Sequence, residues 1–246
     1  MRFALPIILA LATPALADDR ARELSFLAPL MPSALAEYGN LQVPAIENLD
    51  IVTENGEAFL ELRMFEGQAM TLKGYRAEVS VDFPYAEGDT VVYAWRLRIP
   101  ADSGADPENR WWLLGQWHDQ PDRRIGESWD GFALRTPPVL LGYGHVDGQE
   151  VISLAYGAPD TLGVAYTALT RDVWHDLRVE IHWSTGADGW AKAFMDDMDT
   201  PFAEATGRNM FNSYQHFFKL GMYRHPDIQL NSRVQLDDLR IEIISD

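Results

Sequence analysis

Between Tyr75 and Phe83 the chain reads YRAEVSVDF, in which apolar and polar side chains alternate. A period of two is typical of a β-strand with one buried and one polar face. Asn-Gly at positions 55–56 and Asp-Gly at positions 147–148 are typical hairpin turns between such strands. The same alternation recurs over residues 91–99, 177–183 and 239–243. The last of these segments is entered through Asp237-Asp238, where the phase slips as at a β-bulge. The pattern predicts an all-β fold, an antiparallel sandwich of two sheets.

The chain has 246 residues, of which 47% are hydrophobic, enough for a sizeable core. Its net charge of -17 argues against binding to duplex nucleic acid or to an anionic membrane, although a local basic groove remains compatible with it. The absence of cysteine excludes disulfides, a thiol nucleophile and a thiolate zinc site. We therefore expect a globular protein that does not bind nucleic acid.

The first 17 residues have the character of a secretory signal peptide. Arg2 precedes an apolar run that is too short to span a bilayer, and Ala15-Leu16-Ala17 supplies a small-x-small cleavage site. A short helical stretch is expected over 21–38, and no linker or repeat divides the remainder. The expectation is an exported protein, periplasmic or secreted, with a signal peptide at 1–17 and a single domain at 18–246.

A first group of candidate site residues lies between positions 112 and 118, which read WLLGQWH. On a regular strand, Trp112, Gln116 and His118 would share one face. An indole stacks on a sugar ring, an amide binds its hydroxyls, and a histidine transfers protons near neutral pH. The alternative is a structural histidine in a tryptophan-rich strand.

A second group lies in the segment FFKLGMYR at 217–224. Lys219 and Tyr223 would face one way, roughly 13 Å apart at Cα, and converge over Gly221. Arg76 and Glu78 occupy the polar face of their own strand, where an ordinary ion pair is the alternative to a functional role.

The sequence contains little that supports a hydrolase. No Gly-x-Ser-x-Gly elbow, phosphate loop or dinucleotide fingerprint occurs. A two-carboxylate glycosidase needs paired acids on one strand face. The nearest acids, at 127, 130, 196, 197 and 199, occupy loop-like sequence instead.

Four segments taken together resemble the heparin lyase I-like polysaccharide lyases, a β-jelly-roll (concanavalin A-like) family that also resembles glucuronan lyases. They are KGYRAE at 73–78, QWHD at 116–119, WSTGADGW at 183–190 and KLGMYR at 219–224, and the resemblance extends over roughly residues 50–244. It implies a lyase that cleaves an acidic polysaccharide by β-elimination and leaves an unsaturated uronate end.

The resemblance also implies which residues act. His118, Lys219, Tyr223 and Arg76 take the catalytic positions. Gln116, Trp112 and Arg224 are expected to bind substrate beside them. A further N-terminal glutamine is expected in heparin lyases, and no residue of this chain is assigned to it.

The chemistry needs the same residue types. Cations and amides would neutralise the uronate carboxylate. We hypothesise His118 as the base and Tyr223 as the acid, with Tyr223 also as the base if both protons lie on one face of the sugar. Apart from Arg123-Arg124 the chain lacks the basic segments with which heparin lyases bind sulfate, so a non-sulfated or sparsely sulfated uronate polymer, such as a glucuronan or an alginate-like chain, fits better than heparin.

We expect no required cofactor, a monomer, and no membrane contact after signal cleavage. Structural Ca²⁺ could be held by the acids at 196–199 or 237–238. The alternative function is a non-catalytic, lectin-like module that stacks sugars on Trp111, Trp112, Trp117 and Trp129.

Overall fold

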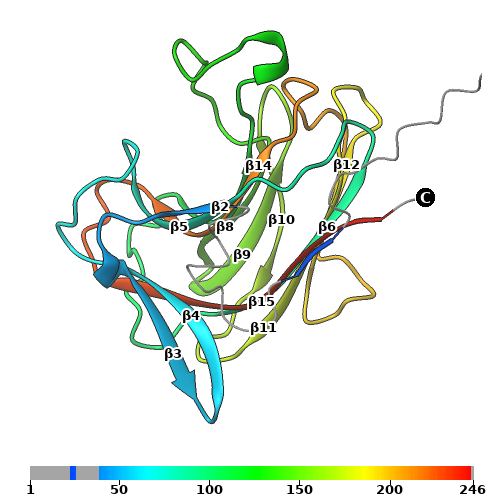
Figure 1. Ribbon diagram of the computed structural model, residues 1–246. Coiled ribbons are helices and arrows are strands. Elements are labelled where there is room, and N and C mark those ends of the chain that lie inside the picture. Colours follow the sequence, from blue (N-terminus) through cyan, green and yellow to red (C-terminus); the bar gives the residue numbers. More distant parts are fainter. Residues whose placement is uncertain (1–22, 26–38, 245–246) are drawn as a thin grey trace, which may run out of the picture.

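The computed structural model describes residues 23–25 and 39–244. Two antiparallel sheets face each other, with no α-helix among these residues and only two short 3-10 turns, Ile46–Asn48 (η1) and Arg123–Ile125 (η2) (Figure 1). Sheet A has the order β13(Ala203–Thr206)-β12(Trp190–Met195)-β11(His175–His182)-β6(Thr90–Arg98)-β15(Ser232–Ile244)-β4(Glu57–Met64)-β3(Leu49–Glu54), with β1(Glu23–Ser25) also paired to β15. Sheet B has the order β10(Leu162–Ala168)-β9(Gln149–Tyr156)-β8(Val139–Val146)-β7(Trp112–His118)-β14(Phe217–Arg224)-β5(Tyr75–Val81)-β2(Gly39–Gln42). The predicted all-β sandwich is confirmed.

The alternating segments form the strands that the sequence predicts. Residues 75–81, 90–98 and 175–182 are β5, β6 and β11. The expected phase slip in the last strand is also present: its register shifts between Asp237 and Arg240, and Asp238 has φ 51°. The helical expectation for 21–38 is wrong at 23–25, which is β1; its other residues and the signal peptide at 1–17 lie outside the described residues.

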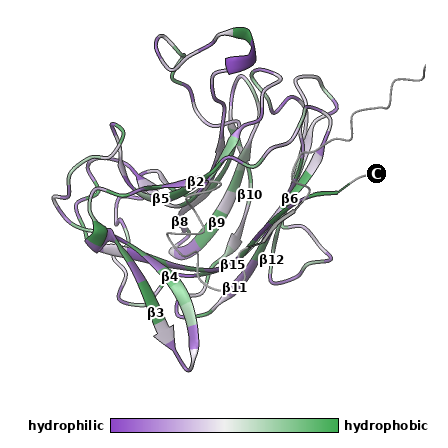
Figure 2. Ribbon diagram, in the orientation of Figure 1, coloured by the Kyte–Doolittle hydropathy of each residue, from purple (hydrophilic) through white to green (hydrophobic). Residues whose placement is uncertain are grey.

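The core fills the space between the sheets. Leu60, Trp95, Trp117 and Phe218 are among its buried side chains, and the Trp117 and Phe218 rings stack with centroids 4.8 Å apart. Figure 2 shows hydrophobic segments along the strands and more hydrophilic residues in the connecting loops. Because one face of sheet B is needed for this core, its polar residues collect on the other face.

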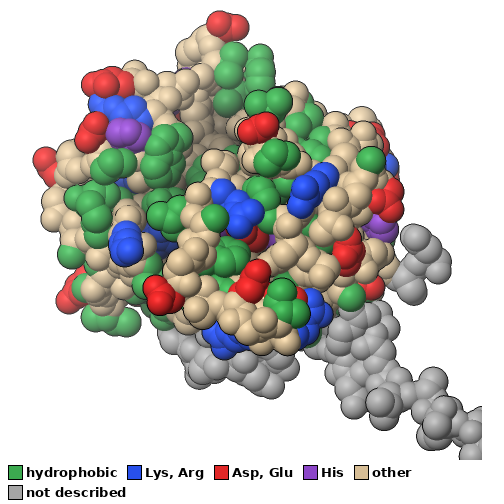
Figure 3. Space-filling view, turned by 90° about the horizontal axis from the view of Figure 1, so that it is seen from above, with side chains coloured by type: hydrophobic (Ala, Val, Ile, Leu, Met, Phe, Trp, Pro, Cys, Tyr) green, Lys and Arg blue, Asp and Glu red, His purple; other side chains and the backbone are tan. Residues whose placement is uncertain are grey.

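Seen from above, Lys and Arg side chains are scattered among acidic and hydrophobic ones (Figure 3). This face has no broad basic patch, in keeping with the net charge of -17. No helix in the described part of the chain is long and apolar enough to cross a membrane.

Candidate active site

A polar cluster lies on the outer face of sheet B, where β2, β5, β14 and β7 are neighbours. Strand register aligns its members: Lys219 is opposite Gln116 across β14 and β7, and Tyr223 is opposite Arg76 across β14 and β5. Directly opposed residues in an antiparallel pair have Cβ atoms about 5 Å apart. The fold therefore brings together residues 76, 116, 219 and 223 from three different strands.

Glu78 is the acidic centre of this cluster. Its carboxylate is 2% exposed; it accepts a hydrogen bond from Arg76 Nη1 (3.1 Å) and one from Gln116 Nε2 (2.5 Å). Burial raises the pKa of Glu78, while Lys219, Arg76 and Gln116 act in the opposite direction. Arg76 thus forms the ion pair that the sequence suggested, and it does so inside the candidate site.

Lys219 supplies a second cation. It is 6% exposed, and its Nζ lies 4.8 Å from the centroid of the Phe217 ring. Burial lowers its pKa to about 8, partly offset by Glu78, while Arg76 lowers it further. Two cations, Arg76 and Lys219, therefore accompany one carboxylate in the cluster.

Tyr223 lies against Arg76, whose guanidinium carbon is 4.1 Å from the Tyr223 ring centroid. The Trp111 ring meets Tyr223 edge-on at 5.0 Å. Gly74 closes a third side: a Cβ at this position would lie 2.6 Å from Tyr223 Cε2 and 2.7 Å from Arg76 Nη2. The Tyr223 side chain is therefore packed between the Arg76 guanidinium, the Trp111 ring and the backbone at Gly74.

His118 lies apart from Tyr223. It is opposite Phe217, six residues before Tyr223 on β14, which corresponds to roughly 20 Å along the strand. Its Nδ1 is 2.8 Å from both the carbonyl and the carboxylate of Asp119, and its Nε2 is 3.1 Å from the carbonyl of Arg135. Both ring nitrogens therefore contact acceptors of Asp119 and Arg135, and neither nitrogen is directed into the Tyr223 cluster.

Two expected substrate residues are buried and do not lie in the polar cluster. The register of β7 shifts between Leu113 and Gly115, so Trp112 is not on the face of Gln116 as predicted: it is 4% exposed and packs in the core. Arg224 is 1% exposed and donates to Ser232 Oγ and the Leu230 carbonyl, both at 2.6 Å. The prediction for Trp112 was wrong because it assumed regular alternation along β7, which the bulge interrupts.

The role expected for Gly221 also needs correction. Its φ is 139°, and a Cβ there would lie 2.4 Å from the Ala77 carbonyl oxygen and 2.7 Å from Leu62 Cδ1. The glycine is required by close packing against β5 and β4 rather than to open space between Lys219 and Tyr223.

Two polar residues beside the candidate side chains were not predicted from the sequence. Gln42 on β2 is 7% exposed and accepts a hydrogen bond from Arg76 Nη1 at 3.2 Å. Gln42 lies on a short strand at the edge of sheet B, and the sequence gave no local signal for it. Asp119 is fully buried and lies between His118 and Arg135, whose Nε is 3.2 Å from its carboxylate.

The acids considered for Ca²⁺ are engaged locally. Asp196 Oδ2 lies 2.7 Å from His175 Nδ1, and Asp197 Oδ1 accepts from the backbone of Asp199 and Thr200. Within 23–25 and 39–244 no group of three or more His, Cys, Asp or Glu side chains is placed to hold a metal ion.

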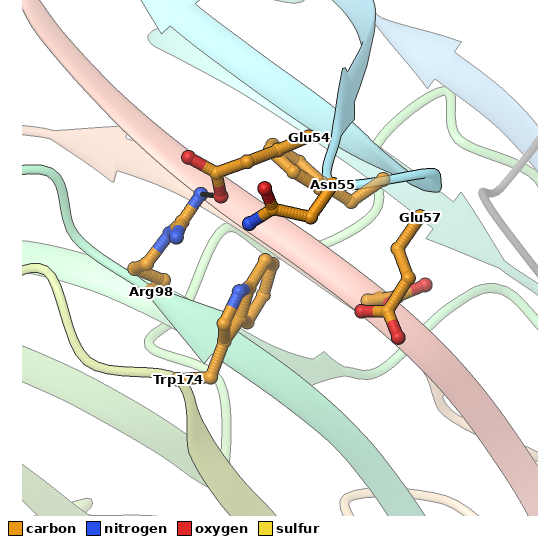
Figure 4. Close-up of a pocket in the computed structure, with 7 residues that line it drawn as sticks. Glu54, Asn55, Glu57, Arg98 and Trp174 are labelled. Carbon is orange, nitrogen blue, oxygen red and sulfur yellow. Dashed lines mark ion pairs between the residues drawn. The ribbon is translucent and has the colours of Figure 1, made fainter.

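A hollow of about 190 Å³ lies on sheet A, away from the polar cluster (Figure 4). Arg98 lies between Trp174 and Glu54 there, with its Nη2 2.9 Å from Glu54 Oε2. The cation is thus paired within the hollow. A second hollow, of about 280 Å³, adjoins Tyr223 through Trp111 and Leu113.

Solved structures with this fold include several polysaccharide lyases. The endo-β-1,4-glucuronan lyase of the fungus Trichoderma reesei aligns over 92% of this chain and 96% of its own, with 15% identity and a TM-score of 0.62. A Lys-to-Ala/Tyr-to-Ala variant of the alginate lyase Aly36B with an alginate tetrasaccharide aligns over 91% and 97%, with 14% identity and a TM-score of 0.62. A His-to-Asn/Tyr-to-Phe variant of the family 7 alginate lyase A1-II′ with substrate aligns over 85% and 94%, with 10% identity and a TM-score of 0.59.

At these identities the likeness concerns the fold, and it confirms the expected jelly roll. No curated protein sequence matches the chain. The family model described as "Polysaccharide lyase" matches residues 37–239, which include all strands that form the polar cluster. The chain belongs to this polysaccharide lyase family.

Proposed function

We propose that this lyase cleaves a uronate-containing polysaccharide by β-elimination at the Tyr223 cluster. The observation that carries the proposal is an excess of one positive charge: Arg76 and Lys219 accompany the single carboxylate of Glu78 beside a tyrosine. In a protein of net charge -17, a local cationic excess is suited to a substrate carboxylate.

The reaction removes the proton at C5 of the uronate and forms the C4–C5 double bond as the bond from C4 to the glycosidic oxygen breaks. The proton on that oxygen completes the leaving group. Negative charge develops on the C6 carboxylate during this step, and cations fixed in a site of low exposure stabilise it without reorganising. Lys219 and Arg76 take this role.

Tyr223 is the proton carrier in this proposal, taking the C5 proton and returning one to the leaving oxygen. Arg76, 4.1 Å from the ring centroid, stabilises negative charge on the phenol oxygen while Tyr223 acts as the base. His118 is the weaker candidate for this role because its nitrogens contact Asp119 and Arg135. Gln116 contributes by orienting Glu78.

The structural neighbours support the same substrate class, because glucuronan and alginate are both uronate polymers. Densely sulfated heparin fits less well. Of the adjacent pair Arg123 and Arg124, Arg124 already binds the Asp122 carboxylate, with its Nη2 2.8 Å from Oδ2. Family membership favours the lyase over the lectin alternative, and Trp112 and Trp117 are core residues rather than stacking platforms.

Export remains part of the proposal, resting on the signal-like residues 1–17. N-terminal sequencing of the protein recovered from outside the cytoplasm checks it. A mature chain beginning at Asp18 is expected, and an uncleaved cytoplasmic chain would contradict it.

Ultraviolet absorbance of the unsaturated uronate tests the activity directly. The wild-type protein is incubated with alginate, glucuronan, hyaluronan and heparin, with Tyr223→Phe as the matched variant. We expect a rise with at least one unsulfated polymer, little with heparin, and none with the variant. Flat traces with every polymer would overturn the proposal.

A further inference from the structure

The hollow beside Tyr223, here the Trp111 hollow, has a lining that includes Trp111, Leu113, Gly142, Gly144, Ser153 and Tyr166, with Arg110 and His145 as its basic members. It is continuous with the polar cluster, because Leu113 is opposite Tyr223 in the sheet and Trp111 touches the Tyr223 ring. A sugar placed in it would be the neighbour of the sugar at Tyr223.

The walls of the Trp111 hollow are aromatic and accessible. Trp111 is 44% exposed and Tyr166 is 54% exposed, whereas most aromatic side chains of sheet B are in the core. Two exposed rings in the lining of a hollow of about 280 Å³ are suited to the apolar face of a pyranose.

The floor is built from neutral groups. Gly142 and Gly144 alternate along β8, and the space that a Cβ would occupy is taken by Ser153 Oγ, at 2.8 Å, and Asn109 Oδ1, at 2.6 Å. Asn109 is bound to both the N–H and the carbonyl of His145. Ser153 therefore places a hydroxyl, and no charge, at the bottom of the hollow.

Both basic side chains of the lining are already paired. Arg110 Nη2 lies 2.6 Å from Glu108 and its Nη1 donates to the Asp227 carbonyl, also at 2.6 Å. His145 Nε2 is 3.5 Å from Glu150, a carboxylate that Arg171 also contacts at 2.6 Å. A second uronate in this hollow would lose water without gaining a cation, which is unfavourable for a carboxylate.

The two neighbouring positions thus differ in charge: the cluster at Tyr223 has one cation in excess, and the Trp111 hollow has none. We propose that the Trp111 hollow is a subsite for an uncharged pyranose, so that the preferred substrate is a mixed polymer in which the cleaved uronate adjoins a neutral sugar. This inference rests on the proposed β-elimination at Tyr223.

The test compares kcat/KM for alginate and glucuronan, which contain uronates only, with hyaluronan and desulfated chondroitin, in which uronates alternate with neutral sugars. We expect at least a tenfold preference for an alternating polymer. Equal or faster cleavage of the homopolymers would overturn the inference while leaving the proposed function intact. Absence of product from all four would overturn the proposed function and this inference with it.

Two variants locate the preference in the hollow. Tyr166→Lys adds a cation to the lining and is expected to raise relative activity on alginate or glucuronan at least fivefold. Leu162→Lys adds the same charge on β10 at a 68% exposed position outside the lining and should leave the preference unchanged. An equal shift in both variants would show a general charge effect and contradict the assignment.

Discussion

The guanidinium of Arg76 lies over the ring of Tyr223, with 4.1 Å between its carbon and the ring centroid, and strand register places the two residues directly opposite each other. The same guanidinium contacts Glu78 and Gln42 through Nη1. A buried three-way arrangement therefore fixes the cation that faces the proposed proton carrier.

Removal of the phenol oxygen tests Tyr223. Tyr223→Phe keeps the ring contacts with Arg76 and Trp111, so the melting temperature should change little. Loss of the proton carrier should lower kcat by about 100-fold or more. Steady-state kinetics and thermal melts measure the two effects; a variant that retains more than a third of wild-type kcat would exclude Tyr223 from the chemistry.

His118 should matter much less to the reaction. Because its ring nitrogens contact Asp119 and Arg135 rather than the cluster, His118→Ala should lower kcat/KM less than about tenfold, at the low end of general acid–base effects. Parallel measurement with Tyr223→Phe gives the comparison. A loss in His118→Ala as large as in the tyrosine variant would restore His118 as the base.

Gly74 is expected to position the two central side chains. A methyl group at this site would lie within 2.7 Å of both Tyr223 and Arg76, whose side-chain ends can move aside. Gly74→Ala should therefore reduce kcat at least tenfold with little loss of thermal stability. Gly67→Ala is the control for steric crowding, because a Cβ there meets no atom within 4 Å; since Gly67 has a positive φ, its melting temperature is compared as well.

Ionisation of Lys219 should determine the pH at which activity declines on the alkaline side. Burial lowers its pKa to about 8, and the proposed reaction needs the ammonium form. The value of kcat/KM should therefore fall as the pH rises through about 8. Lys219→Arg keeps its positive charge to higher pH, so the alkaline decline of kcat/KM should shift to higher pH in this variant. If the decline stays at the same pH, another ionisable group causes it.

His216 should control stability in mild acid. It is fully buried, and burial lowers its pKa from 6.5 to about 4. Between these values the unfolded chain binds a proton that the folded chain does not, so this contribution to stability is lost as the pH falls from 6.5 towards 4. Thermal melts across this range should show a shallower acid loss for His216→Gln; an equal slope in both proteins would assign the loss to other groups.

Most of the fold could be predicted from local patterns of apolar and polar residues. Alternation in 75–83 and its repeats predicted the strands, and the phase slip at Asp237-Asp238 predicted a bulge. The bulge in β7 was not predicted, because Leu114 and Gly115 continue an apolar run in either phase. That one residue moved Trp112 into the core and away from Gln116.

Part of the candidate site could also be predicted from the sequence. The sequence by itself determined that Arg76, Glu78, Lys219 and Tyr223 occupy polar positions on strands, because a period of two assigns each residue to a face. The cluster, the burial of Glu78 and Lys219, the entry of Gln42 and the separation of His118 from Tyr223 were decided by tertiary structure alone. These depend on which strands become neighbours and in which register, and that is set by packing between residues far apart in the chain.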